Sequence, residues 1–332
     1  MFLGTGFICP VKHSSVGMAR VAVARGEALL RYSFPEPHPL NRVRLERFYE
    51  LLDRENLGDR VAFIEPEMST VEDIMLFHTK DYVEFVQEKS QKGYGYLDYG
   101  DTPAFPGCYE ASAYVVGTTL KLLKLILDGV FKTAFNPMGG LHHARRDRAG
   151  GFCIFNDAAI AIEYLLKKVG LKSVAYVDID AHHGDGVCYD FYSDERVVFA
   201  DIHQDGRTLY PGTGFRHEMG EGRARGHKLN IPLLPYSGDD EFIKAFQEVE
   251  EFLEKHEFDF VLLQCGADGL MGDPLTTLQY SDRAHGYAAS RLKEISSRRC
   301  GGRILAMGGG GYSPENVARA WTAVVKALAE DC

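Results

Sequence analysis

The stretch SVAYVDIDAHHGDGV, residues 173–187, decides the fold. Its opening, SVAYV, is a short apolar run of the kind found in buried strands of parallel sheets. The run leads into three aspartates and two histidines, which are Asp178, Asp180, His182, His183 and Asp185. Burying an ionisable group without a partner costs kilocalories, so this density of charge at the end of a strand indicates a bound ion or a reaction site.

The rest of the chain extends this pattern. From about residue 130, expected strands in KTAFNPM, RVVFADI, FDFVLLQCG and RILAMG alternate with helical segments such as NDAAIAIEYLLKKVG, DDEFIKAFQEVEEFLEKHE and PENVARAWTAVVKAL. Such alternation is typical of a parallel sheet with helices on its faces. The earlier residues begin with an expected strand, FLGTGFI, followed by helices in HPLNRVRLERFYELL, STVEDIMLFHTKDYVEFVQ and YEASAYVVGTTLKLLKLIL. No linker interrupts the chain, so we expect one domain over residues 1–332.

Further polar motifs also follow expected strands. His142 and His143 come after TAFNPMGG, Asp268 comes after FVLLQCGA, and Tyr312 follows the glycines after ILAM. In open α/β sheets, ligands bind beyond the carboxyl ends of the strands. We therefore expect these side chains to converge on one pocket with those that follow SVAYV.

Part of this group has the composition of a metal site. Asp180, His182 and Asp268 offer two carboxylates and one imidazole. This set, without a thiolate, is typical of an open catalytic site for Zn²⁺ or Fe²⁺. Such an ion lowers the pKa of a bound water to about 7 and polarises a carbonyl oxygen, which favours hydrolysis.

The remaining members offer a base and an oxyanion donor. The tandem His142 and His143 are the candidate base, and Asp178 and Asp185 are left to orient the two rings from behind. Tyr312 is the candidate donor, because the glycines before it let the loop pass close to a ligand.

Each motif also has a purely structural explanation. A histidine pair is often a hydrogen-bonded core couple, an aspartate after a strand often caps a helix, and a run of glycines often forms a turn. The motifs favour catalysis because they occur together, at the ends of neighbouring strands and with complementary roles.

Six blocks in chain order resemble the histone deacetylase superfamily, including its bacterial and archaeal acetoin-utilisation branch. They are HPLNRVRLERFYELL, NPMGGLHHARRDRAGGFCIFND, YVDIDAHHGDGV, LYPGTG, GADGLMGDPL and GGGGY. The resemblance spans almost the whole chain and implies a single-domain, arginase-like α/β fold with a mainly parallel, eight-stranded sheet and helices on both faces. It also implies a zinc-dependent amidohydrolase that removes acetyl, or another short acyl group, from lysine.

The resemblance also implies roles for individual residues. The metal ligands of the family correspond to Asp180, His182 and Asp268. Its catalytic groups correspond to Tyr312, which polarises the amide carbonyl, to the general base His143, to its electrostatic partner His142, and to Asp185 and Asp178 behind the rings. Members also hold a monovalent cation, K⁺ or Na⁺, which here would lie near Asp178, Asp180 and Asp201. A serine is often found at the position of Asp201.

The substrate-binding positions of the family correspond to Asp101, Gly151, Phe152, Tyr210, Leu275 and Arg42. Gly151 and Phe152 belong to one wall of the acyl-lysine tunnel, and Tyr210 stands opposite, where phenylalanine is usual. Asp101 matches the rim aspartate that grips the substrate backbone, and Arg42 matches the arginine of the acetate exit channel. Leu275 replaces the glutamate expected in polyamine-specific members, which argues against a polyamine substrate.

Composition disfavours other classes of function. The net charge of −10 and the absence of a long basic cluster disfavour direct binding of nucleic acid, whereas an acidic mouth would attract basic peptides. The seven cysteines form no C-x-x-C pair, so neither a disulfide framework nor a thiolate metal site is expected. The N-terminus lacks the features of a signal peptide, and no apolar run approaches the ~20 residues of a membrane span. We therefore expect a cytoplasmic protein without membrane contact.

The leading hypothesis is hydrolysis of acetyl-lysine in a protein or peptide, with release of acetate. One alternative keeps the site but assigns it a small N-acetylated amine or polyamine. The other alternative is a protein that binds acyl-lysine without turnover. The sequence carries no signal for an oligomeric state.

Overall fold

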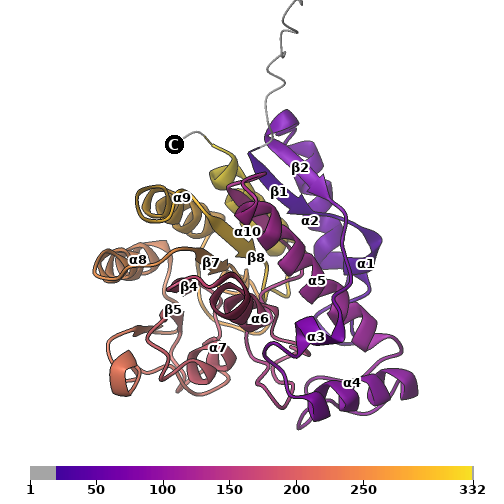
Figure 1. Ribbon diagram of the computed structural model, residues 1–332. Helices are drawn as coiled ribbons and strands as arrows, with labels where there is room; N and C mark the ends of the chain where they lie inside the picture. Colours follow the sequence, from indigo (N-terminus) through magenta and orange to yellow (C-terminus); the bar gives the residue numbers. More distant parts are fainter. Residues whose placement is uncertain (1–19, 331–332) are drawn as a thin grey trace, which may run out of the picture.

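The structure is a computed structural model that describes residues 20–330 (Figure 1). Its centre is one sheet of eight strands in the order β2-β1-β3-β8-β7-β4-β5-β6, and every pairing between neighbours is parallel. The strands are β1 (Val21–Ala24), β2 (Val61–Ile64), β3 (Thr133–Asn136), β4 (Val174–Asp178), β5 (Val197–Gln204), β6 (Lys228–Leu233), β7 (Val261–Gln264) and β8 (Ile304–Met307). The predicted eight-stranded parallel sheet is confirmed.

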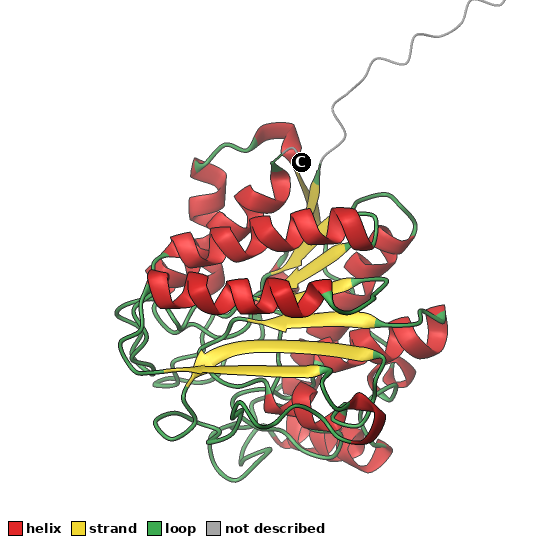
Figure 2. Cartoon of the chain, turned by 90° about the vertical axis from the view of Figure 1, so that its left-hand side faces the viewer, coloured by secondary structure: helices red, strands yellow, loops and turns green. Residues whose placement is uncertain are grey.

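Helices cover both faces of the sheet (Figure 2). One row consists of α2, α10, α9 and α8, each packed on the next, while α5 packs on β3 and on α6. The helices are α1 (Glu27–Leu30), α2 (Val43–Arg54), α3 (Val71–Ile74), α4 (Lys80–Lys92), α5 (Cys108–Leu127), α6 (Asp157–Glu163), α7 (Asp185–Asp190), α8 (Asp239–Glu254), α9 (Asp282–Arg299) and α10 (Pro314–Ala329), with the 3₁₀-helices η1 (Gly58–Arg60) and η3 (Gly222–Ala224) and the π-helix η2 (Tyr164–Val169).

Three strands were not predicted from the sequence. The four-residue runs of β1 and β2 lie in the part of the chain expected to be mostly helical, and the expected strand FLGTGFI lies outside the described residues. The third, β6, is an edge strand in which polar residues alternate with apolar ones. It also contains Pro232, which an edge strand tolerates because its outer side needs no ladder hydrogen bond.

The helices differ from the predictions in several places: the short helices α1 and α7 were not predicted, and the predicted helix NDAAIAIEYLLKKVG forms α6 followed by the π-helix η2. The stretch STVEDIMLFHTKDYVEFVQ forms two helices, because Thr79 caps a second one through a 3.4 Å hydrogen bond from the Tyr82 backbone N–H. Helix α9 was not predicted, since five of its seven buried positions are small or polar, with Ala284, His285 and Ala288 among them. A face of this kind gives little apolar periodicity.

This topology brings the polar motifs to one edge of the sheet. All eight strands run in the same direction, so the segments that follow β3, β4, β7 and β8 leave from the same end. Asp178, at the end of β4, stands in register with Asp201 of β5. Within residues 20–330, no helix is both long and apolar enough to cross a membrane. The single domain and the cytoplasmic location stay predictions.

Candidate active site

Three candidate metal ligands meet beyond the ends of β4 and β7. The ligand atoms of Asp180, His182 and Asp268 all lie within 4.8 Å of one another, and all three side chains are buried. The Nδ1 atom of His182 lies 3.1 Å from Asp180 Oδ1 and 2.9 Å from Asp268 Oδ2. Two oxygens and one nitrogen therefore lie around one point, which is a donor set suited to Zn²⁺ or Fe²⁺.

The charges of this cluster favour a cation. Burial lowers the pKa of His182, but the carboxylates of Asp268 and Asp180 outweigh it and raise the pKa to about 10. Burial and the charge of Asp180 raise the pKa of Asp268 to about 7. Without an ion, His182 and Asp268 therefore tend to hold protons. A divalent ion that bound between them would displace these protons. The residues fit such an ion.

Asp180 is held in place by groups that face its two oxygens. Oδ2 accepts hydrogen bonds from Gln264 Nε2 and the Gly310 backbone, both at 2.8 Å, and Oδ1 accepts one from the His182 backbone at 3.0 Å. A Cβ at position 310 would meet Asp268 Oδ2 at 2.3 Å, so glycine is required there. Gln264 was not predicted, although a polar residue at the end of the apolar run VLLQ was a usable signal.

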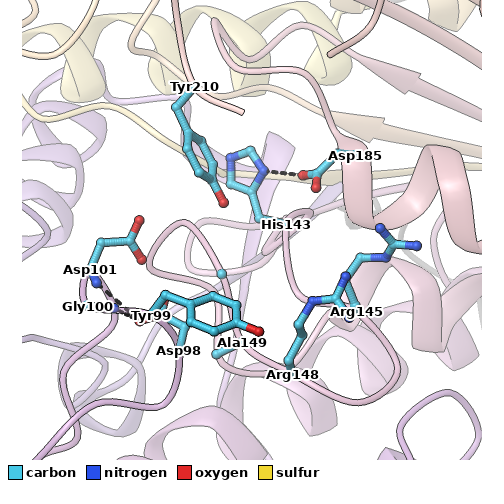
Figure 3. A pocket seen from close by; sticks show the side chains of 11 residues that line it. Asp98, Tyr99, Gly100, Asp101, His143, Arg145, Arg148, Ala149, Asp185 and Tyr210 are labelled. Carbon is cyan, nitrogen blue, oxygen red and sulfur yellow. Dashed lines mark hydrogen bonds and ion pairs between the residues drawn. The ribbon is translucent and has the colours of Figure 1, made fainter. Parts of the chain in front are cut away.

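His142 and His143 turn their Nε2 atoms toward each other, 3.1 Å apart. Each ring is backed by a carboxylate. His142 Nδ1 lies 2.8 Å from Asp178 Oδ2. His143 Nδ1 lies 2.7 Å from Asp185 Oδ1, and Figure 3 shows this second contact. Because a carboxylate accepts hydrogen bonds, each Nδ1 carries a proton. His142 Nε2 also lies 4.0 Å from Asp180 Oδ2, which places the pair beside the ligand cluster.

The two rings differ in charge. Burial opposes a charge on His142, but Asp178 and Asp180 outweigh it and raise its pKa to about 10. Burial and the positive charge of His142 lower the pKa of His143 to about 4. Near neutral pH, His142 therefore donates from Nε2, whereas His143 keeps a lone pair on Nε2. Only His143 can accept a proton at that atom.

The loop that carries both histidines is fixed by the start of α6. Asp157 Oδ1 accepts the backbone N–H groups of residues 140 and 141 at 3.0 and 2.9 Å. Asn156 donates from Nδ2 to the backbone carbonyl of His142 at 3.2 Å. The sequence predicts that these two residues cap a helix, and Asn156 does cap α6. Their second role depends on contacts across the fold, for which the local sequence carries no signal.

Tyr312 lies at the same inner cavity as the histidines. This cavity has a volume of about 10 Å³, and its lining includes both histidines, Asp180 and Tyr312. The Tyr312 backbone donates to Asp273 Oδ2 at 2.8 Å, and its ring meets the Phe152 ring edge-on at 5.7 Å. Burial and the charges of Asp268 and Asp180 raise the pKa of Tyr312 well above its usual value. Its hydroxyl therefore stays protonated and can donate.

Aromatic rings flank the way into this cavity. Phe152 lies against Tyr312, and the Tyr210 ring lies 5.1 Å from the His143 ring at an angle of 79°. Gly151 has a φ of 52°, and a Cβ there would meet the His143 ring at 2.3 Å. Both facts require glycine beside the candidate base. The structure thus brings all three predicted tunnel positions to the site.

Of two further predicted residues, Asp101 lines the outer cavity and Leu275 is linked to the site through Asp273. Asp98 Oδ1 accepts the backbone N–H groups of residues 100, 101 and 102 at 2.9, 3.1 and 3.0 Å, which fixes the loop of Asp101. Burial and the Asp98 carboxylate raise the pKa of Asp101 to about 7. Leu275 is 40% exposed, and its backbone N–H donates to Asp273, the residue that also holds Tyr312.

The arginine assignment needs a correction. Arg42 lies at the surface, where Nε donates to Glu46 at 2.7 Å and the side chain is 48% exposed. The arginine beside the site is Arg44, which is 1% exposed and donates from Nη2 to the Gly309 carbonyl at 2.7 Å. Its Nε and Nη1 have no hydrogen-bond partner among the described residues. The sequence did carry a signal for Arg44. This residue lies four positions before Phe48, so both lie on the buried face of α2.

Asp201 has protein partners on both oxygens. Oδ1 lies 2.6 Å from His203 Nδ1, and Oδ2 accepts the Gly184 backbone N–H at 2.8 Å. His203 Nε2 lies 2.8 Å from the Gly214 carbonyl, so both of its nitrogens face acceptors. Burial and the charge of Asp178 raise the pKa of Asp201 to about 6, although His203 opposes this. A monovalent cation beside Asp201 stays a prediction.

Known proteins share this sequence over most of its length. The family model for the histone deacetylase domain matches residues 38–328. The acetoin utilization protein AcuC of Bacillus subtilis (strain 168) is 38% identical over 303 residues, which cover 88% of this chain and 78% of that protein. The acetoin utilization protein AcuC of Staphylococcus aureus (strain MSSA476) is 36% identical over 327 residues, which cover 96% of this chain and 82% of that protein.

The fold has a solved counterpart as well. The crystal structure of the HDA15 HD domain superposes with a TM-score of 0.84 and 30% identity, covering 94% of this chain and 88% of that chain. The matched range of the family model contains the ligand cluster, the histidine pair and Tyr312. These matches confirm the resemblance predicted from the sequence, and the chain belongs to the histone deacetylase family.

Proposed function

We propose that the protein hydrolyses the amide of N6-acetyl-lysine in a protein or peptide and releases acetate, with zinc held by Asp180, His182 and Asp268. The observation that carries this proposal is the inner cavity, where the histidine pair and Tyr312 meet beside the ligand cluster. The family supports deacetylase chemistry and typically uses zinc. Acetyl-lysine as the substrate is the finer part of the proposal.

Each group at the inner cavity has one task. A divalent ion bound there would polarise the acetyl carbonyl and acidify a water molecule. Tyr312 donates a hydrogen bond to the carbonyl oxygen as negative charge develops on it. His143 accepts the proton of the attacking water at Nε2, and Asp185 stabilises the imidazolium that results. As the carbon–nitrogen bond breaks, His143 passes this proton to the leaving lysine amine.

His142 remains charged throughout this cycle. Its Nδ1–H is bound to Asp178, so the ring cannot turn away, and its Nε2 faces His143 Nε2 and lies 4.0 Å from Asp180 Oδ2, so its positive charge stands beside the ligand cluster. The charge of His142 also keeps His143 neutral until the water gives up its proton. The two adjacent histidines therefore act as one stabiliser and one base.

The outer parts of the site suit an acyl-lysine and its products. The rings of Phe152 and Tyr210 offer apolar surface to the lysine stem, and Asp101 offers an acceptor to the substrate backbone. The buried guanidinium of Arg44, with two nitrogens that lack hydrogen-bond partners among the described residues, suits the acetate that is released.

The test is acetate release from an acetyl-lysine peptide by protein that has been chelated and then reloaded with Zn²⁺ or Fe²⁺. We expect release only after reloading and little competition from acetylputrescine. Faster turnover of acetylputrescine than of the peptide would favour a small-amine substrate. Tight peptide binding by folded, metal-loaded protein without any acetate release would favour a binding protein.

The rim predicts a specific pH dependence. Asp101 accepts a substrate N–H much more strongly as a carboxylate than as a neutral acid, and its pKa is raised to about 7 by burial and by Asp98. We therefore expect kcat/KM for a peptide to fall as the pH drops through about 7. Asp98→Asn keeps an oxygen for the three backbone N–H groups but removes the neighbouring charge. This variant should shift the fall in kcat/KM to lower pH.

The measurement is the pH profile of kcat/KM for the parent protein, Asp98→Asn and Asp101→Asn. Asp101→Asn serves as the control, because it has no carboxylate to titrate and should lose the fall near neutral pH. The same midpoint in the parent and in Asp98→Asn would contradict the role given to this pair of acids.

A further inference from the structure

The outermost cavity of the site carries opposite charges on two sides. This mouth cavity has a volume of about 350 Å³, and its lining includes Tyr210. In Figure 3, Asp98 and Asp101 lie on one side of it, and Arg145 and Arg148 lie on the other. The sequence predicts an acidic mouth, but the two arginines make its charge bipolar.

The acidic side already has its partners. Asp98 accepts three backbone N–H groups of its own loop, and Asp101 accepts the Thr102 hydroxyl at 3.0 Å. In the proposed function, Asp101 also accepts the substrate backbone. Asp185 also lines the cavity, on the side of Arg145 in Figure 3, and it is bound to His143. These acids therefore orient the loop, the base and the substrate backbone.

The two arginines differ in whether their side chains are available to bind a ligand. Arg145 Nε donates to Asp190 at 2.5 Å, with both side chains mostly buried, and its guanidinium lies over the Tyr189 ring. Among residues 20–330, the Arg148 side chain pairs only with its neighbour Asp147 at 3.0 Å, and these side chains are 49% and 63% exposed. A pair this exposed is weak and exchanges readily with water or another anion. Arg148 is therefore the arginine that can bind a ligand.

The backbone of Arg148 is nevertheless fixed. Its carbonyl accepts the Arg145 backbone N–H at 2.9 Å, which closes a tight turn. In the next turn, Gly150 and Cys153 exchange backbone hydrogen bonds at 3.2 and 2.9 Å. These turns lead directly to Gly151, beside the candidate base. A short, braced segment thus holds the Arg148 backbone at a constant place beside the site, and the guanidinium moves only on its own side chain.

We propose that Arg148 binds a carboxylate that the substrate carries next to its acetyl-lysine. This inference rests on the proposed function. When the lysine side chain reaches His143, the substrate backbone lies in the mouth cavity. Asp101 holds this backbone on one side, so a neighbouring substituent faces the other side, where Arg148 lies. A planar guanidinium binds a carboxylate through two parallel hydrogen bonds, which neither a lysine nor an amide substrate group can reproduce.

The carboxylate has two sources that the experiment separates. One is an acidic side chain before or after the acetyl-lysine, and the other is the α-carboxylate of an acetyl-lysine that ends the chain. The first set of substrates is amide-capped peptides that differ only in Glu, Gln or Lys at one neighbouring position. The second set is acetyl-lysine peptides that end in a free carboxylate or in an amide.

We expect the metal-loaded protein to prefer Glu over Lys by roughly tenfold in kcat/KM, with Gln between them, and to lose part of this preference at high salt. Arg148→Glu should reverse the order of the peptides. The matched control is Arg298→Glu, which changes the charge equally. Arg298 is 54% exposed and pairs with Glu254, at the end of α9 that leads into β8 and away from the site. This control should keep the parent preference.

Each result decides between the two proposals. Equal kcat/KM for all peptides, or a preference for Glu that persists in Arg148→Glu, would overturn the role of Arg148 and leave the deacetylase proposal intact. If the metal-loaded protein cleaves no peptide, the deacetylase proposal fails. The Kd values of the same peptides for the parent and Arg148→Glu proteins then test the role of Arg148 directly, with the same expected order.

Discussion

Metal-loaded Tyr312→Phe protein is expected to keep its fold and its affinity for substrate but to lose roughly a hundredfold to a thousandfold in turnover. The ring contact with Phe152 does not involve the hydroxyl, so phenylalanine preserves the packing. Its backbone hydrogen bond to Asp273 is also preserved. The substitution therefore removes one donor, the one aimed at the carbonyl oxygen, whose negative charge is greatest in the transition state. Such a loss appears in kcat and leaves KM nearly unchanged.

The control for this substitution is Tyr210→Phe. It removes a hydroxyl from the other tyrosine of the site, whose ring lies against His143. Phenylalanine at this position should change turnover by no more than about twofold, because its ring still covers the base. Steady-state kinetics and metal content of both variants make the comparison. Unchanged turnover in metal-loaded Tyr312→Phe would leave carbonyl polarisation to the metal and His142 alone.

The sequence predicted those site residues that are ionisable and stand at the ends of apolar strands. Asp180, His182 and Asp268 were recognisable because they occur together with the other polar motifs, at the ends of neighbouring strands and with complementary roles. Gln264 and Asp157 act through contacts with residues distant in the chain, such as the bond from Gln264 to Asp180. These residues look like ordinary strand or cap residues until the strands are paired. Their roles follow from the topology of the sheet.

The error at Arg42 has a geometric cause. A helix turns by 100° per residue, so two positions along α2 lie about 200° apart around its axis. Arg42 therefore points to solvent while Arg44 points to the core, although both lie in the same block of sequence. Alignment within a short block does not fix which of two nearby arginines faces the site. The apolar periodicity of Leu45, Phe48 and Leu52 decides it, because it identifies the buried face.

Short strands limited the prediction of the fold for a related reason. β1 and β2 are four residues each, too short for a periodic signal, and their pairing with each other and with β3 is what identifies them. The strands that were predicted carry longer apolar runs or lead into polar motifs. The sheet was therefore predictable where it supports the site, and less so at its edges.

Asp180→Asn is expected to abolish zinc binding at concentrations that saturate the parent protein and to lower turnover by roughly a thousandfold or more. Oδ2 of Asp180 accepts from two donors, Gln264 and the Gly310 backbone. An amide nitrogen cannot accept those bonds, so the amide must turn its oxygen toward them. Its NH₂ group then takes the place of Oδ1 and faces the metal position. In one orientation of the amide, its NH₂ group replaces the charged oxygen that faces the metal position. In the other orientation, the hydrogen bonds from Gln264 and the Gly310 backbone are lost.

The matched control is Asp259→Asn. Asp259 also accepts a backbone N–H, from Lys172 at 2.7 Å, but it precedes β7 and lies at the opposite end of the sheet from the ligand cluster. Metal that binds only the folded state stabilises it, so zinc should raise the Tm of the parent and of this control. It should leave the Tm of Asp180→Asn unchanged, while circular dichroism confirms that the variant is folded. A folded Asp180→Asn protein that binds zinc as the parent does would show that Asp180 is not a ligand, and the hydrolytic mechanism built on this cluster would fall with it.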